Sequence, residues 1–294
     1  MFESLQSIVE LGSTQQKAFW QIVLEDDLSE RQVSREVSIK QMTDTWDAML
    51  LAAAAYDKNL RSQSGLVGGD GDKMEQYRTC FGKSLCGDFV LKAIAGALQM
   101  GESNACMKRI VAAPTAGACG VLPAVLVPYY LEKRGTLDEM IQALYVSAGI
   151  GQVIAHRASI SGAAGGCQAE IGSASAMAAG ALVHLLGGDN MQIIHAAAMS
   201  LKNLLGLVCD PVAGLVEVPC VKRNVIGAVN AMSCADMAMA GIISKIPPDQ
   251  VIDAMGEVGE KMDVSLRETA KGGLAATPEG IDVASRFSQS QNSH

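Results

Sequence analysis

Apolar residues recur at intervals of three and four along most of the chain, the spacing that places them on one face of an α-helix. Strand-like segments at 207–208 and 215–218 are too short to build a sheet. Glycine-rich stretches interrupt the helical pattern at 64–71, 116–120 and 161–166. The pattern therefore predicts an all-α (mainly α) fold with glycine-rich loops between helices. The predicted helices cover residues 4–11, 14–25, 30–55, 88–98, 121–134, 137–156, 167–186, 191–205, 225–244 and 248–262.

The two ends of the chain are expected to differ from its middle. No Pro/Ser-rich linker divides the sequence, so residues 1–284 are expected to form a single large helical domain. Within it, residues 1–60 are predicted to be an outer helical segment that packs on the rest. Residues 285–294 are polar and rich in Ser and Gln, a composition that predicts a disordered tail.

Composition excludes several classes of protein. Of 294 residues, 49% are hydrophobic but only 4% aromatic, which favours closely spaced helices over aromatic-filled sheets. A net charge of −8 argues against nucleic-acid binding, which needs clustered Lys and Arg. The uncharged stretch 111–131 reaches the length of a membrane span, but its three prolines favour a buried helix instead. Glu3 and Glu10 interrupt the first apolar positions, so no secretory signal is expected. We predict a cytoplasmic protein with reduced thiols.

Three of the eight cysteines stand beside helix-breaking residues. Cys167 follows two glycines, Cys209 precedes Asp-Pro, and Cys220 follows a proline. Cysteines in loops ahead of helices can aim sulfur into a cavity, and a helix N-terminus favours the thiolate that a metal needs. Their wide spacing does not match a zinc knuckle, whereas iron–sulfur clusters tolerate scattered thiolate ligands. From spacing alone, buried structural cysteines are the leading alternative, because free Cys often packs as a small hydrophobe.

The segments around these cysteines carry longer phrases. Residues 162–174 read GAAGGCQAEIGSA, residues 209–220 read CDPVAGLVEVPC, residues 114–120 read PTAGACG, and residues 158–163 read ASISGA. These phrases resemble the iron–sulfur L-serine dehydratases, and within that family the α chain of the two-subunit bacterial form. The resemblance runs from about residue 64 to residue 280. It implies that Cys167, Cys209 and Cys220 hold a [4Fe-4S] cluster with one open iron.

Glycine and hydroxyl residues ahead of predicted helices form the candidate substrate pocket: Thr115, Gly117, Ser159 and Ser161. Backbone N–H groups and the helix dipole at such positions can bind a substrate carboxylate. Turns and N-caps would explain the same residues, but the resemblance places these phrases around the active site. Weaker candidates from stretches that the family shares are Ser64, Lys73 and Asn104. A solvated lysine and a helix cap explain the last two equally well.

The sequence leaves the general base unknown. His156 closes a predicted helix and is a weak candidate, because the helix dipole alone accounts for a histidine there. The resemblance implies a Ser-Ser-Ser-His-Thr-type phrase on a separate β chain, so the base is expected to come from that partner. Arg157 stands where the family commonly has Asn, which either alters a substrate contact or is a structural substitution. A homo-oligomer is compatible with the sequence.

The activity implied by the resemblance is that of an L-serine ammonia-lyase. L-Serine would lose its Cα proton to a base and its β-hydroxyl to a Lewis-acidic iron, giving pyruvate and ammonia. Two alternatives stay open. One is an L-cysteine desulfidase with a similar cluster, and the other is a non-enzymatic iron–sulfur carrier or sensor.

Overall fold

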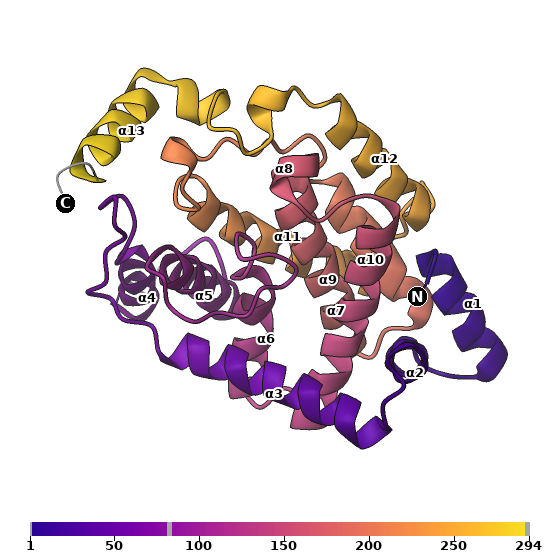
Figure 1. Ribbon diagram of the computed structural model, residues 1–294. Coiled ribbons are helices and arrows are strands. Elements are labelled where there is room, and N and C mark those ends of the chain that lie inside the picture. The colour runs from indigo at the N-terminus through magenta and orange to yellow at the C-terminus, as the bar shows by residue number, and fades with distance from the viewer. Residues whose placement is uncertain (1, 81–83, 292–294) are drawn as a thin grey trace.

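The computed structural model describes residues 2–80 and 84–291, and α-helices dominate it (Figure 1). Within those ranges no strand forms, and Cys209 and Arg267 make an isolated parallel bridge. The all-α prediction is confirmed. The α-helices are α1 (Leu5–Gln15), α2 (Phe19–Arg31), α3 (Arg35–Ala54), α4 (Asp70–Cys80), α5 (Asp88–Ala105), α6 (Val121–Leu131), α7 (Leu137–Arg157), α8 (Gly162–Gly165), α9 (Ser173–Leu185), α10 (Asn190–Lys202), α11 (Cys220–Met239), α12 (Pro248–Lys261) and α13 (Pro278–Gln291). Shorter turns are η1 (Gln168–Gly172), η2 (Val212–Gly214), η3 (Val264–Leu266) and η4 (Gly273–Ala276).

The centre of the molecule is α9, which α6, α7, α10 and α11 surround (Figure 1). Residues 173–183 are all buried, which a helix can achieve only when it is apolar or small on every side. Small side chains let the neighbouring helices approach closely. A Cβ on Gly180 would lie 2.2 Å from Cδ1 of Ile150, so that position needs glycine.

Helices α1 to α3 lie at the periphery (Figure 1). They nevertheless supply large side chains that are completely buried, among them Leu5, Phe19 and Trp46. The Trp46 ring meets Tyr130 edge to face, with centroids 5.5 Å apart. The outer segment is therefore part of the main core.

Helix α4 was not predicted, because its sequence is mostly polar. Its first turn is held by the buried Glu102 carboxylate, which accepts hydrogen bonds from the backbone N–H groups of Asp70 (2.7 Å) and Gly71 (3.3 Å). A carboxylate at a helix N-terminus satisfies N–H groups that have no partner within the helix. This contact with Glu102 of α5 stabilises the start of α4, although α4 lacks an apolar face.

The chain end also differs from the prediction of a disordered tail from residue 285. Helix α13 continues to Gln291, while residues 292–294 lie outside the described part. Val283 is buried on one face, and Arg286 pairs with Asp282 one turn earlier, at 3.0 Å. An amphipathic helix is compatible with this polar composition once another part of the fold covers its apolar face.

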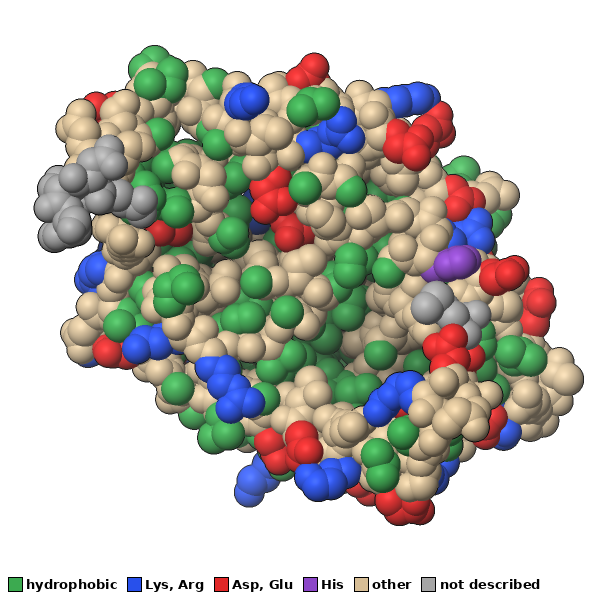
Figure 2. Space-filling view, in the orientation of Figure 1, with side chains coloured by type: hydrophobic (Ala, Val, Ile, Leu, Met, Phe, Trp, Pro, Cys, Tyr) green, Lys and Arg blue, Asp and Glu red, His purple; other side chains and the backbone are tan. Residues whose placement is uncertain are grey.

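The surface in the orientation of Figure 1 carries most of its charged side chains around the rim (Figure 2). Apolar and uncharged side chains occupy much of the middle of this face. Among the described residues, no helix combines the length and the apolar character needed to cross a bilayer.

Candidate metal centre

Cys167, Cys209 and Cys220 come together although long segments separate them in the sequence. All three are buried, with exposed fractions of 1%, 2% and 5%. The Cys209 and Cys220 thiols both donate hydrogen bonds to the Cys167 sulfur. The structure therefore brings the three predicted ligand residues into one cluster.

Cys167 is positioned by the turn that follows it. The predicted continuous helix 167–186 is wrong at its start, because a π-helical turn, η1, precedes α9. Gln168 anchors this turn: its backbone N–H donates to Leu207 O (2.9 Å), and its side chain donates to Met255 O (3.0 Å). The same side chain accepts a bond from the Gly206 N–H at 2.9 Å. Single π-helical turns are common at functional sites, where they change the direction of side chains.

Cys209 is covered by residues 264–276, which we call the C-terminal strap. The Cys209 N–H donates to Leu266 O (2.8 Å), and the Glu268 N–H donates to Cys209 O (2.7 Å). The neighbouring Asp210 carboxylate accepts a bond from the Leu274 N–H at 2.8 Å. The strap therefore holds the Cys209 loop through its backbone.

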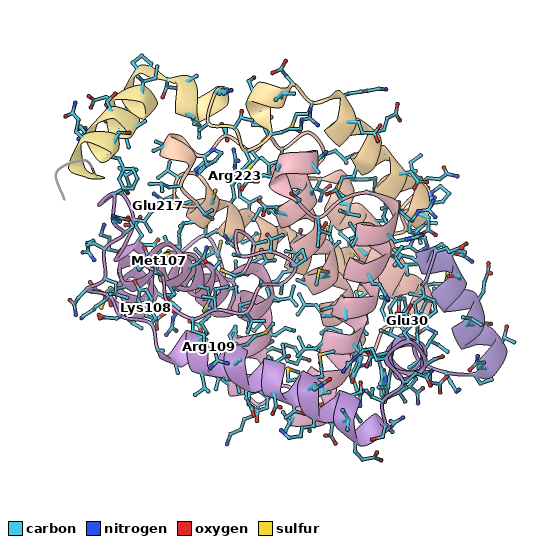
Figure 3. All side chains as sticks on the ribbon, in the orientation of Figure 1. Glu30, Met107, Lys108, Arg109, Glu217 and Arg223 are labelled. Carbon is cyan, nitrogen blue, oxygen red and sulfur yellow. The ribbon has the colours of Figure 1, made fainter. Side chains whose placement is uncertain are left out.

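Arg223 is a cation at the cluster and lies on α11 near α8 (Figure 3). Its guanidinium donates to Asp210 Oδ1 (2.8 Å) and to Val208 O (2.6 Å). It also donates to the Cys167 sulfur. Only 12% of the Arg223 side chain and 5% of the Asp210 side chain are exposed. This residue was not among the site residues predicted from the sequence.

The three thiols share their charge unequally. Hydrogen bonds from Cys209 and Cys220, together with Arg223, hold the pKa of the Cys167 thiol far below its usual value. The same bonds, with burial, raise the pKa of the Cys209 and Cys220 thiols. These opposite pKa shifts favour negative charge on Cys167 over Cys209 and Cys220.

Glu170 is the functional candidate that the sequence analysis missed. A carboxylate oxygen of Glu170 and the sulfurs of Cys167 and Cys209 all lie within 4.8 Å of one another. Burial, with the nearby negative charge of Cys167 and Glu268, raises the pKa of Glu170 to about 7. Its place three residues after Cys167 was visible, but only the π-helical turn reveals the direction of its side chain.

Thr115 and Gly117 both lie against the Glu170 carboxylate. The Thr115 hydroxyl donates to Glu170 Oε1 at 2.7 Å. A Cβ on Gly117 would lie 3.2 Å from the same oxygen. Asn224 ties this segment to the cysteines, because its side-chain N–H donates to Gly117 O (2.8 Å) and to Cys220 O (3.0 Å). Two of the predicted pocket residues thus lie beside the group of three cysteines.

The two predicted serines are placed differently. Ser161 is exposed and directly precedes Gly162, where a Cβ would lie 2.9 Å from Glu170 Oε2 and 3.0 Å from the Cys209 sulfur. Ser159 accepts a bond from the Ser161 N–H (3.1 Å) and lines another cavity of about 390 Å³. Arg157 also lines that cavity.

Arg157 has a structural role in this chain. Its guanidinium makes two bonds to Asp253, at 2.9 Å and 2.7 Å, and a third to Glu3 O at 2.8 Å. These bonds join α7 to α12 and to the N-terminus. The structure therefore favours the structural explanation of this arginine.

The weaker candidates make contacts with groups other than the three cysteines. Ser64 donates to the Glu217 carboxylate, Lys73 is exposed and pairs with Asp70 at 2.8 Å, and the Asn104 carbonyl accepts from the Met107 N–H at 3.0 Å. His156 is exposed in the last turn of α7. Their suggested roles in substrate binding and catalysis remain predictions.

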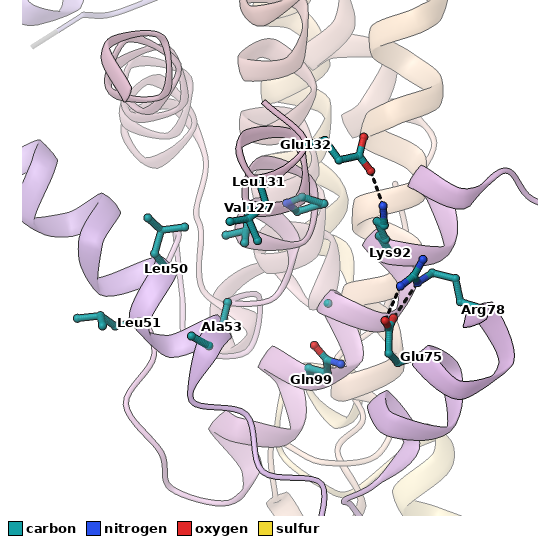
Figure 4. A pocket seen from close by; sticks show the side chains of 14 residues that line it. Leu50, Leu51, Ala53, Glu75, Arg78, Lys92, Gln99, Val127, Leu131 and Glu132 are labelled. Carbon is teal, nitrogen blue, oxygen red and sulfur yellow. Dashed lines mark hydrogen bonds and ion pairs between the residues drawn. The ribbon is translucent and has the colours of Figure 1, made fainter. Parts of the chain in front are cut away.

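A larger cavity, of about 630 Å³, lies between α3, α4, α5 and α6 (Figure 4). Apolar Leu50 and Leu131 line it together with the pair Lys92–Glu132, whose charged atoms are 2.7 Å apart. No cysteine in the described ranges lines it.

Comparison with known proteins places the whole arrangement in a family. The family model described as "Serine dehydratase alpha chain" matches residues 14–275, which include all three cysteines, Glu170 and the strap up to Ala275. The chain belongs to the serine dehydratase alpha-chain family. The resemblance inferred from the four sequence phrases is confirmed.

Relatives of different lengths match this chain. A Bacillus subtilis protein named "Probable L-serine dehydratase, alpha chain" is 46% identical over 287 residues, covering 98% of this chain and 95% of the relative. The "L-serine dehydratase, alpha chain" of Peptoniphilus asaccharolyticus is 42% identical and covers 98% of both chains. The "L-serine dehydratase" of Streptomyces coelicolor is 48% identical over 61% of this chain but only 40% of its own length. The longer relatives therefore contain sequence outside the matched region.

Proposed function

We propose that this chain deaminates L-serine to pyruvate and ammonia as the α chain of an iron–sulfur-dependent L-serine ammonia-lyase. The observation that carries the proposal is the convergence of Cys167, Cys209 and Cys220 beside Glu170, inside the family match. Membership of the serine dehydratase family supports the substrate. The cofactor, a [4Fe-4S] cluster, is our inference from the donor set.

The donor set fits a cluster, because the site holds more acidic groups than one cation, Arg223, can pair with. Cys167 and the partly buried Glu170 are close together, and the single guanidinium of Arg223 is shared between Asp210 and the Cys167 sulfur. Buried anionic groups need a pairing cation or a metal, since leaving them unpaired is costly. Three sulfur donors are soft ligands that suit iron–sulfur centres.

The residues around the proposed iron–sulfur cluster have separate roles in the elimination. A bound cluster would supply a Lewis acid for the departing β-hydroxyl. Gly117 and Gly162, which lack a side chain, let the backbone approach Glu170 and Cys209 closely. Glu268, which lies beside Glu170, offers negative charge to the ammonium group of an amino acid. Hydrogen bonds from Arg223 and Asn224 hold the segments that carry the cysteines in place.

Removal of the Cα proton requires a base, and a β chain is our proposed source. Two relatives that match over nearly their full length carry the words "alpha chain" in their names. The elimination releases water and leaves aminoacrylate, which tautomerises to an imine. Hydrolysis of that imine consumes one water and yields pyruvate and ammonia.

Anaerobic reconstitution with ferrous iron and sulfide tests the proposal. We expect a brown protein with about four iron and four sulfide ions per chain. Pyruvate should form from L-serine when a β chain of the two-chain type is added. L-Cysteine is assayed in parallel for released sulfide.

Three other results would contradict the proposal in different ways. Sulfide release in preference to serine turnover would identify a desulfidase. A stable chromophore without turnover of either amino acid would indicate a carrier or sensor. A single zinc ion without sulfide would indicate a mononuclear site, for which sulfurs spaced by roughly 4 Å around one ion are suitable.

A further inference from the structure

Glu170 has the position of a ligand rather than of a surface carboxylate. One of its oxygens lies within 4.8 Å of the sulfurs of both Cys167 and Cys209. Cys220 joins the same group through its hydrogen bond to Cys167. Two sulfurs and one oxygen of a single chain therefore meet, and a third sulfur is hydrogen-bonded to one of them.

The surrounding backbone is shaped to hold that carboxylate. The π-helical turn η1 contains Glu170 and follows directly after Cys167, so both side chains come from one rigid turn. Gly117 and Gly162 lie on either side, and a Cβ on them would be 3.2 Å from Oε1 and 2.9 Å from Oε2. Any larger residue at either position would displace the carboxylate.

The two oxygens of Glu170 have different surroundings. Oε1 accepts the Thr115 hydroxyl at 2.7 Å, which fixes the orientation of the carboxylate. Oε2 faces the point at Gly162 where a Cβ would also be 3.0 Å from the Cys209 sulfur and 3.2 Å from Glu268 Oε2. A second carboxylate offers no hydrogen to an ionised Oε2, so this oxygen is suited to a cation.

We propose that Glu170 is the fourth donor of the metal centre, an exchangeable oxygen ligand to the iron that the three cysteines leave open. This inference rests on the proposed function and deepens it. A carboxylate is a harder ligand than a thiolate and prefers harder metals, so it binds a cluster iron less firmly than cysteine does. It can therefore protect the fourth iron and still give way to a substrate oxygen.

Three variants, reconstituted anaerobically beside the wild type, test this assignment. Glu170→Gln keeps the shape but removes the charge, and Glu170→Asp keeps the charge but shortens the reach. Glu268→Gln is the matched control, because it removes the neighbouring carboxylate. Thermal unfolding of each metal-free variant shows whether the fold persists.

The readouts are iron and sulfide content, Mössbauer spectra with enriched iron, and the rate at which mild oxidation produces a three-iron signal in electron paramagnetic resonance. In Glu170→Gln, the spectrum of one iron should change while three stay as in wild type. The three-iron signal should appear several-fold faster. Glu170→Asp should fall between the two, and Glu268→Gln should match wild type.

The possible failures are distinguishable. If the wild type binds no cluster, the proposed function fails, and this inference fails with it. If all proteins hold a full cluster but Glu170→Gln matches wild type, the function stands and the inference alone is overturned. A spectral change in Glu268→Gln instead would assign the ligand to the wrong carboxylate. Complete loss of iron in Glu170→Gln, with the fold intact, would overturn its exchangeable character.

Discussion

Two groups of cysteines in this protein are buried to the same extent but lie in opposite surroundings. Cys119 and Cys234 have exposed fractions of 0%, close to the 1% of Cys167. Burial raises the pKa of the Cys119 thiol to about 12 and that of Cys234 to about 11. Two thiol donors and Arg223 instead lower the pKa of the Cys167 thiol.

The difference shows that burial does not identify a ligand cysteine, whereas its neighbours do. Desolvation disfavours a thiolate, and only donors or cations within the buried site can reverse that effect. Cys119 lies at the start of α6, with the Met100 carbonyl 3.8 Å from its sulfur, and Cys234 lies on α11. Neither has the guanidinium and the paired thiols that surround Cys167.

The largest expected effect separates the two groups by metal content. Cys167→Ala, Cys209→Ala and Cys220→Ala should each abolish iron binding and activity, because neither a void nor an oxygen can replace a soft thiolate. Cys119→Ala should keep the brown chromophore and lose only about 1 kcal/mol of stability. Iron analysis and absorbance spectra check both. Bleaching of Cys119→Ala as complete as that of Cys209→Ala would end the distinction.

Removing the buried cation should have the next largest effect. Arg223→Met leaves Asp210 and the Cys167 thiolate without their partner, and we expect the free energy of unfolding to fall by about 3–5 kcal/mol. Arg157→Met is the matched control, since Asp253 is 48% exposed and such pairs contribute about 1 kcal/mol or less. Urea denaturation of the metal-free proteins compares them. Equal losses in the two variants would show that the charge at the cysteines is unimportant for stability.

Glycine substitutions should have opposite signs at the site and in the helical framework. Gly162→Ala would place a methyl group 3.0 Å from the Cys209 sulfur and should cost about 1–3 kcal/mol, with weaker cluster retention. Gly96→Ala lies inside α5, where the nearest atom is 3.5 Å away, and should stabilise by about 0.5–1 kcal/mol. Thermal unfolding and iron content measure both. The comparison would break if Gly162→Ala were also stabilising.

The smallest expected effect concerns the hydroxyl that orients Glu170. Thr115→Val removes one hydrogen bond, worth about 1 kcal/mol, and should lower kcat/KM for L-serine about fivefold without loss of iron. Thr115→Ser keeps the hydroxyl and should remain close to wild type. A loss of iron in Thr115→Val comparable to that in a cysteine variant would make this residue part of the ligand set.

Helices α7 and α12 were predictable because their information is local, whereas the predicted bounds of α3, α5 and α11 are wrong by five to seven residues. Thr136 and Glu139 form a capping box ahead of α7, and the apolar spacing of α7 and α12 gave their bounds within a residue. Helix α4 and residues 285–291 were missed, because tertiary contacts rather than their own apolar pattern stabilise them. Local propensity cannot report a carboxylate such as Glu102, which arrives from another helix.

By itself, the sequence determined the helical class, the family and the three cysteines worth testing, since all of these are written in residue type and order. Only the tertiary structure decided which charged groups face those cysteines. Glu170 is aimed by a π-helical turn, Arg223 arrives from α11, and Glu268 arrives from the strap. A buried site depends on distances of a few ångströms between segments far apart in the chain. Spacing along the sequence carries no record of those distances.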